Sequence, residues 1–397
     1  MDYEVTPLPS EVTPEICKDT EILEAYEVAV RFEVGAGSDE HKTFARVLGY
    51  LLRELPSQKA RQAVAKQILR CREDPQELAE HGKTFVDYHI GLCEFHDFCG
   101  LFTDLFFESV RQNKQCSTPP SSSGRASTHI KESVKSQAEE SPSSGNIRQD
   151  ALHRDGYRCI ASGNIDYESA LANPSLRELE GDMESTETAH IFPQSLNRHI
   201  KKHHNQELAG QKLNYLGSVF AILDMFGHSV LSEELGGRGI HCLENVLTLC
   251  DGLHKNFDHL RLWFEPIEGQ SNTYKVCTVT RRFRQTGLQE VVTLTSSDPE
   301  NLPLPSTEYL AIHACCARVA NLSGAAGYLD RIYRDRDEIR VLAEDGSSAN
   351  LLGYLLLPLG QAALTIPQVQ PRSNLINPWI EKAYIQYIID VVSTPKQ

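Results

Sequence analysis

Hydrophobic residues recur at helical spacing along the first quarter of the chain. Phe44, Val47 and Leu51 follow Ser38, a residue type whose side chain caps helix N-termini. A second helical pattern covers residues 63–71, and a third, rich in aromatic residues, covers 84–110. Together these patterns predict a small all-α domain over residues 1–113.

The pattern changes between Cys116 and Gly145, where Ser, Pro, Thr, Gly and Glu crowd together and large apolar residues nearly vanish. Such a composition buries too little apolar surface to offset the entropy cost of becoming ordered. We therefore predict a flexible, disordered linker over residues 114–147.

Helical and strand-like patterns alternate after the linker. Helical spacing covers 213–226 and, as one long helix, 307–336. These patterns predict an α+β domain over 148–295 and a C-terminal helical extension over 296–397 that packs on it. The strand-like runs cover 246–249, 260–265 and 274–280.

Composition narrows the class of protein. The chain has 397 residues, 39 Lys and Arg against 54 Asp and Glu, and a net charge of −15. No apolar run approaches the roughly 18 residues that a membrane-spanning helix needs, and the N-terminus lacks the pattern of a secretion signal. Eleven cysteines without the spacing of a disulfide scaffold fit a reducing compartment. We expect an intracellular protein, in the nucleus or cytoplasm, with no membrane partner.

No segment carries the basic excess of a dedicated nucleic-acid clamp. Residues 1–113 hold 12 basic and 21 acidic side chains, and residues 146–295 hold 15 and 19. An enzyme that binds nucleic acid transiently needs only a local basic strip, however. Two basic clusters are candidates for phosphate contacts or, equally, for a solvated turn and the decoration of an edge strand. The first comprises Arg198, His199, Lys201, Lys202, His203 and His204, and the second comprises Arg281, Arg282 and Arg284.

Three fragments carry the residue types of a hydrolytic site, namely 187–193 (ETAHIFP), 244–250 (ENVLTLC) and 253–258 (LHKNFD). In this order, and with Asn245 nine residues before the histidine of the third fragment, they resemble the His-Asn-His (HNH) endonuclease family. The upstream run 157–163 (YRCIASG) is similar to the entry segment of the fungal-type branch of that family. The resemblance implies a ββα-metal core, in which two strands and a helix surround one divalent ion.

The resemblance also implies a role for each of four residues. His190 would be the general base, Asn245 would orient its imidazole, and His254 and Asp258 would bind the metal. Phosphodiester hydrolysis needs a base that titrates near neutrality and a cation that neutralises developing charge. His254 and Asp258 are four residues apart on a predicted helix, so both project from one face. Such a pair suits Mg or Mn, with Zn or Ni as alternatives.

Two positions depart from the family pattern. Many family members carry a further metal ligand directly before the catalytic histidine, where this chain has Ala189. The cysteine pairs that bind a structural zinc in some members are also incomplete, because Cys159 is followed by Ser162 and Cys250 by Leu253. We therefore expect no structural zinc site.

These observations predict a metal-dependent endonuclease whose partner is nucleic acid, with DNA as the expected substrate. Two alternatives stay open. Ala189 and the acidic charge favour a catalytically degenerate HNH fold that serves as a binding module, and retention of His190 as a base permits an enzyme that acts on a small molecule. The helical residues 1–113 carry no catalytic signature, so we expect them to bind a protein partner or to self-associate.

Overall fold

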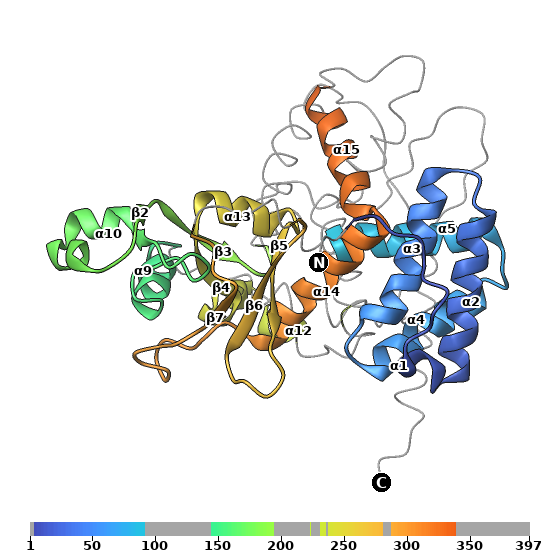
Figure 1. Cartoon of the computed structure of the whole chain (residues 1–397), viewed down its shortest axis with the longest axis horizontal. Helices are drawn as coiled ribbons and strands as arrows, with labels where there is room; N and C mark the ends of the chain where they lie inside the picture. Colours follow the sequence, from blue (N-terminus) through green and yellow to red (C-terminus); the bar gives the residue numbers. More distant parts are fainter. Residues whose placement is uncertain are drawn as a thin grey trace, which may run out of the picture.

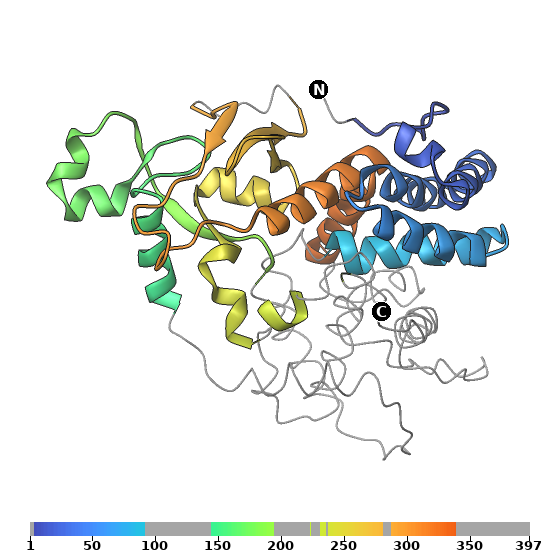
Figure 2. The same ribbon diagram turned by 90° about the horizontal axis from the view of Figure 1, so that it is seen from below.

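The computed structural model describes residues 4–91, 144–193, 223, 231–235, 237–280 and 287–338. Helices and small β-sheets are both present, which confirms the predicted α+β class (Figure 1). The N-terminal helices lie at one end, and the sheets lie towards the other. Helix α14 (Thr307–Ser323) runs between these two parts (Figure 2).

Side chains able to cap a helix precede most of the N-terminal helices. Ser38 accepts a hydrogen bond from the backbone N–H of His41 (3.1 Å), and α3 begins directly after it, as the sequence predicts. Asp19, Ser57 and Asp74 cap α2, α4 and α5 in the same way. The helices are α1 (Pro14–Cys17), α2 (Thr20–Gly35), α3 (Asp39–Glu54), α4 (Gln58–Arg70) and α5 (Pro75–Phe85), followed by the π-helical turn η1 (Val86–Ile90).

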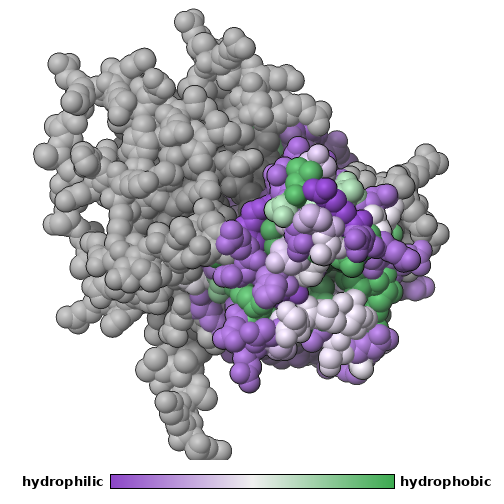
Figure 3. All heavy atoms as spheres, turned by 90° about the vertical axis from the view of Figure 1, so that its left-hand side faces the viewer, coloured by the Kyte–Doolittle hydropathy of each residue, from purple (hydrophilic) through white to green (hydrophobic). Residues whose placement is uncertain are grey.

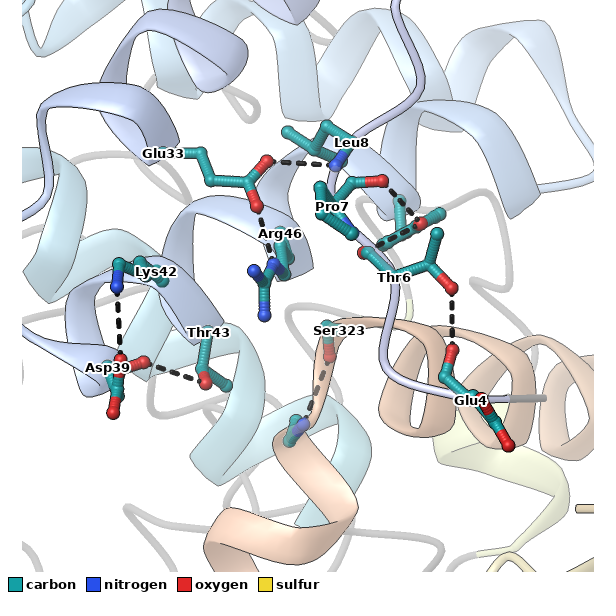
Figure 4. Close-up of polar contacts among 12 residues, drawn as sticks. Glu4, Thr6, Pro7, Leu8, Glu33, Asp39, Lys42, Thr43, Arg46 and Ser323 are labelled. Atoms are coloured by element: carbon teal, nitrogen blue, oxygen red, sulfur yellow. Dashed lines mark hydrogen bonds and ion pairs between the residues drawn. The ribbon is translucent and has the colours of Figure 1, made fainter.

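The segment before α1 ties the N-terminal helices to the end of α14. The buried carboxylate of Glu33 accepts hydrogen bonds from Leu8 N (2.8 Å) and from Arg46 Nε (2.6 Å) (Figure 4). Thr6 N donates to Leu322 O at 3.0 Å, and the Tyr50 hydroxyl donates to Thr6 O at 3.0 Å. This segment therefore connects α2 and α3 to the end of α14.

The strands form three small sheets. A parallel pair, β1–β2, an antiparallel pair, β3–β4, and an antiparallel sheet in the order β5–β6–β7 make up the β structure of the described residues. The predicted runs 246–249, 260–265 and 274–280 correspond to β4, β5 and β6. The strands are β1 (Ile165–Asp166), β2 (Met183–Glu184), β3 (Thr186–His190), β4 (Val246–Cys250), β5 (Leu262–Pro266), β6 (Thr273–Thr278) and β7 (Val291–Thr293).

Helix α14 is buried on almost all sides because it packs on α3 and on β5 together. Arg318 projects from α14 and forms ion pairs with Glu54 of α3 (2.7 Å) and with Glu265 of β5 (3.3 Å). One continuous hydrophobic core runs from the N-terminal helices through α14 to β3, β4 and β5. A fragment that began near residue 146 would therefore lose the cover that α3 gives to α14.

The prediction of one long helix over residues 307–336 is wrong in one respect, because the structure has two helices there. Helix α14 ends at Ser323, and α15 (Ala325–Glu338) begins after Gly324. Gly324 has φ +88°, a left-handed conformation that glycine adopts at little cost and that ends an α-helix. A Cβ atom at this position would also lie 3.3 Å from Val5 of the N-terminal segment.

Several predicted segments fall wholly or partly outside the described residues. The aromatic pattern continues past residue 91, where the description stops, and its helical start is α5 and η1 rather than one straight helix. Most of the predicted linker also lies outside, although its last four residues belong to α9 (Ser144–Arg154). The helical pattern 213–226, apart from Leu223, and both basic clusters at 198–202 and 281–284 lie outside as well.

Candidate functional site

Strands β3 and β4 run antiparallel, and α13 (Asp251–Asp258) follows β4 without an intervening loop. The register pairs His190 with Val246 at one end of the ladder. Since side chains alternate along a strand, Glu187 and Ala189 share one face of β3, and Thr188 and His190 share the other. Neighbouring residues of the fragment 187–193 are thereby directed to opposite sides of the strand pair.

Different helices cover the two faces. Glu187 contacts His254 of α13, so the face with Glu187 and Ala189 is called the α13 face. The opposite face is called the α9 face, because Ile147 and Ala151 of α9 pack there on Val246, the partner of His190. Figure 1 shows α9 and α13 on either side of β3 and β4.

Three ionisable side chains form a row between β3 and α13. His254 Nδ1 lies 2.6 Å from Glu187 Oε2, and His254 Nε2 lies 3.3 Å from Asp258 Oδ2. The side chains of His254 and Asp258 are 15% and 17% exposed, whereas that of Glu187 is 52% exposed. The structure thus brings the two predicted metal ligands together and adds Glu187 beside them.

The row suits a divalent ion held by two protein side chains. An imidazole nitrogen and a carboxylate oxygen 3.3 Å apart can share one ion at ordinary metal–ligand distances of about 2.0–2.2 Å. Glu187 contacts the opposite ring nitrogen, so His254 cannot present one ion to both carboxylates. In keeping with this geometry, no group of three or more His, Cys, Asp or Glu side chains in the described residues converges on a metal position.

His190 lies in a different environment. It is only 3% exposed, and its ring meets that of His241 edge to face with the centroids 5.6 Å apart. His241 is the last residue of the 3-10 turn η4 (Gly237–His241). Nothing in the sequence pattern singled out His241, because its approach to His190 depends on the pairing of β3 with β4, which are distant in the chain.

Asn245 is fully buried and binds the main chain on two sides. Its Oδ1 accepts from Phe192 N (2.8 Å), and its Nδ2 donates to Phe192 O (3.0 Å) and to Ile240 O (2.9 Å). These bonds hold the chain two residues after His190 and one residue before His241. The sequence predicts that Asn245 orients the imidazole; in this geometry any such effect passes through the backbone.

Cys159, Ser162 and Cys250 meet at the far end of β4, although the sequence predicts no zinc site there. Cys250 Sγ lies 3.6 Å from Ser162 Oγ, and both thiols are buried. A hydrogen bond from the Cys250 thiol, with help from Ser162, outweighs burial and lowers the pKa of Cys159 below its ordinary value. The same hydrogen bond, together with burial, raises the pKa of Cys250. Ser162 therefore contributes a hydroxyl group beside the two thiols.

Helix α14 contacts α13 through a buried histidine. His313, fully buried on α14, stacks on Phe257 with the ring centroids 3.8 Å apart, and its Nε2 lies 3.2 Å from Phe257 O. Phe257 directly precedes Asp258, so this contact fixes the end of α13 that carries the carboxylate. The neighbouring Cys315 and Cys316 are buried in the core, as their apolar helix predicts.

The predicted site residues all lie between Cys159 and Glu265, the segment that holds β3, β4 and α13. Residues 159–265 match the HNH endonuclease family. The match covers about a quarter of the chain and confirms the resemblance found in the sequence. Comparisons with curated proteins and with solved structures gave no match.

The HNH match indicates a nuclease class and leaves the substrate, the metal and the residue roles to be inferred. Within the described residues, no helix has the length and apolar character needed to span a membrane.

The position of Glu187 on the α13 face was foreseeable from the two-residue period of a strand, because Glu187 lies two residues before Ala189 and so shares its face.

Proposed function

We propose that β3, β4 and α13 form a ββα-metal core that hydrolyses phosphodiester bonds of nucleic acid, with DNA as the substrate. One observation carries the proposal. The His254 and Asp258 side chains lie 3.3 Å apart on α13, facing β3, inside the segment that matches the HNH family. Glu187 of β3 lies 2.6 Å from the other ring nitrogen of His254, so the three side chains join α13 to β3.

A divalent ion, Mg or Mn in the first instance, would be held by His254 Nε2 and Asp258 and would neutralise charge on the phosphate and the leaving oxygen. Water and the substrate phosphate would supply its other ligands, an arrangement usual for Mg. Glu187 accepts the Nδ1–H of His254, which leaves Nε2 as the ligand atom. Glu187 is therefore a positioning residue in this proposal.

His190 is proposed as the general base that takes the proton from the attacking water. A histidine suits this role because its ordinary pKa lies near neutrality. Asn245 fixes the loop that follows His190 through its bonds to Phe192. Since His190 is 3% exposed, nucleic acid has to displace part of its cover before the ring can reach a water molecule.

A binding module derived from the same fold is the second candidate. Two observations favour it, namely the buried position of His190 and the apolar Ala189 at the position where many family members carry a ligand. A small-molecule enzyme that uses His190 as its base is the third candidate.

The eight described cysteines are all free, which fits the proposed intracellular location.

Supercoiled plasmid distinguishes these readings. The proposal predicts nicking by the purified full-length protein with Mg or Mn, and its arrest by a chelator. It also predicts that His254→Ala abolishes nicking while His153→Ala, at an exposed histidine of α9, does not. DNA binding without any nicking would support the binding module, and the absence of both would leave the small-molecule reading.

A further inference from the structure

Exposed apolar side chains concentrate in one short stretch of the chain. Seven large apolar residues are exposed in the described part of the protein, and four of these lie between residues 165 and 184. Single exposed apolar residues are ordinary, whereas several that lie together on a surface are characteristic of an interaction site. The four are Tyr167 (45% exposed), Leu171 (49%), Leu179 (43%) and Met183 (50%).

These residues belong to a protrusion formed by β1, α10 (Tyr167–Ala172), the 3-10 turn η2 (Pro174–Glu178) and β2. The protrusion lies at the end of the molecule away from the N-terminal helices (Figure 1). Tyr167 and Leu171 are four residues apart on α10 and share one of its faces. Met183 lies in β2, paired with Ile165 of β1, the strand that leads into α10.

The protrusion is a well-anchored structure rather than a loose loop. Buried Asp166 accepts hydrogen bonds from Thr186 Oγ1 (2.6 Å) and from Ser169 N (2.9 Å), the second of which caps α10. Inside, Ile165, Ala170 and Leu176 form a small core of their own. The exposed apolar residues are therefore held outward by a fold that has already buried other apolar side chains.

Acidic residues surround the apolar ones. Residues 165–184 contain six Asp and Glu against one basic residue, Arg177. Arg177 is used inside the protrusion, where it donates to Ala170 O (2.7 Å) and Leu171 O (2.8 Å) at the end of α10. No ion pair links the exposed acidic side chains to a cation in the described residues. They are Glu168, Glu178, Glu180 and Asp182.

We propose that residues 165–184 form a docking platform for a basic, amphipathic segment of a protein partner. The apolar side chains gain free energy when a partner covers them, and the acidic rim selects for lysine and arginine beside that partner's apolar residues. Figure 3 views the molecule from this end and shows apolar residues set among hydrophilic ones. The negative rim repels nucleic acid and repels the same face of a second copy of this chain, whose net charge is −15.

The test uses the full-length protein and two short peptides of identical leucine and lysine composition. One peptide places leucine at helical spacing on one face, and the other has a scrambled order. The platform is expected to bind the patterned peptide about tenfold more tightly than the scrambled one, which corresponds to about 1.4 kcal/mol. Fluorescence anisotropy measures both affinities.

Two variants and one control assign this binding to the platform. Leu171→Ser combined with Met183→Ser should remove the tenfold preference, and Glu178→Gln combined with Glu180→Gln should weaken binding of both peptides and its dependence on salt. Val291→Ser changes an apolar residue that is equally exposed (49%) on β7 and should leave the preference intact. Equal binding of the two peptides, or a preference that survives Leu171→Ser with Met183→Ser, would overturn the proposal. Loss of DNA binding or of self-association in the variant with Leu171→Ser and Met183→Ser would also overturn the proposal, because the platform would then bind nucleic acid or a second copy of this chain.

Discussion

The polar side chains on the two faces of β3 differ in the residues they contact and in how far they are exposed. On the α13 face, Glu187 meets His254 and Asp258, and these side chains are 52%, 15% and 17% exposed. On the α9 face, His190 is 3% exposed and lies against His241. The difference teaches that the proposed metal ligands and the proposed base can be tested separately, because removal of His190 should leave His254, Asp258 and Glu187 in place.

The largest expected effect concerns the α9 face. His190→Ala should lower the nicking rate by about a hundredfold or more, the usual scale for a positioned base. Its affinity for Mn should stay within about twofold of the natural protein, because His190 and Glu187 lie on opposite faces of β3. Parallel rate and calorimetric measurements check both points. An unchanged rate would remove His190 from the mechanism, and a loss of Mn binding would show that the faces are not separate.

Asn245→Ala should lower the free energy of unfolding by about 2–3 kcal/mol. The substitution removes three hydrogen bonds and leaves the buried backbone groups of Phe192 and Ile240 without them. Urea denaturation measures the change. Asn301→Ala is the control, because Asn301 is exposed and bonds only Asp298 through its side chain; it should cost less than about 0.5 kcal/mol. Similar losses in the two variants would contradict the role of Asn245 as a clamp of the main chain.

On the α13 face, Glu187→Gln should weaken Mn binding by between about ten- and a hundredfold, the range for a group that orients a metal-binding histidine. Stability should hardly change, because Glu187 is half exposed. Glu268→Gln, at an exposed position of the same domain, controls for the lost charge. Equal Mn affinities of the two variants would mean that Glu187 has no part in the site.

Ala189→Asp tests the α13 face by adding a carboxylate to it. The new carboxylate would point towards α13, as Glu187 does, and should raise Mn affinity by about tenfold. Ala189 is fully buried in the hydrophobic core, so the variant should be less stable than the natural protein without metal and should recover stability as Mn is added. Thermal unfolding at increasing Mn concentration measures this recovery. Its absence would show that position 189 does not reach the ion.

Local spacing accounts for what the sequence could predict. The separation of His254 and Asp258 by four residues is enough to place them together on a helix, and Ser38 is enough to start α3. The apolar run 246–249 is enough to predict the strand β4. Each of these depends on residues that are near neighbours in the chain.

Long-range contacts account for what the sequence could not predict. His241 reaches His190 across the long insertion, and Arg318 joins Glu54 to Glu265 over more than two hundred positions of the chain. Val5 and Gly324 also lie close together although they are distant in the chain, because a Cβ at Gly324 would be 3.3 Å from Val5. Periodicity carries no information about such partners.

Titration of Mn into the full-length protein by calorimetry tests the central claim most directly, namely that His254 and Asp258 form a metal site. The account predicts one saturable Mn site per chain, lost in His254→Ala and retained in His153→Ala, whose histidine is exposed on α9. Mn binding that is equal in all three proteins, or absent from the natural protein, would contradict it.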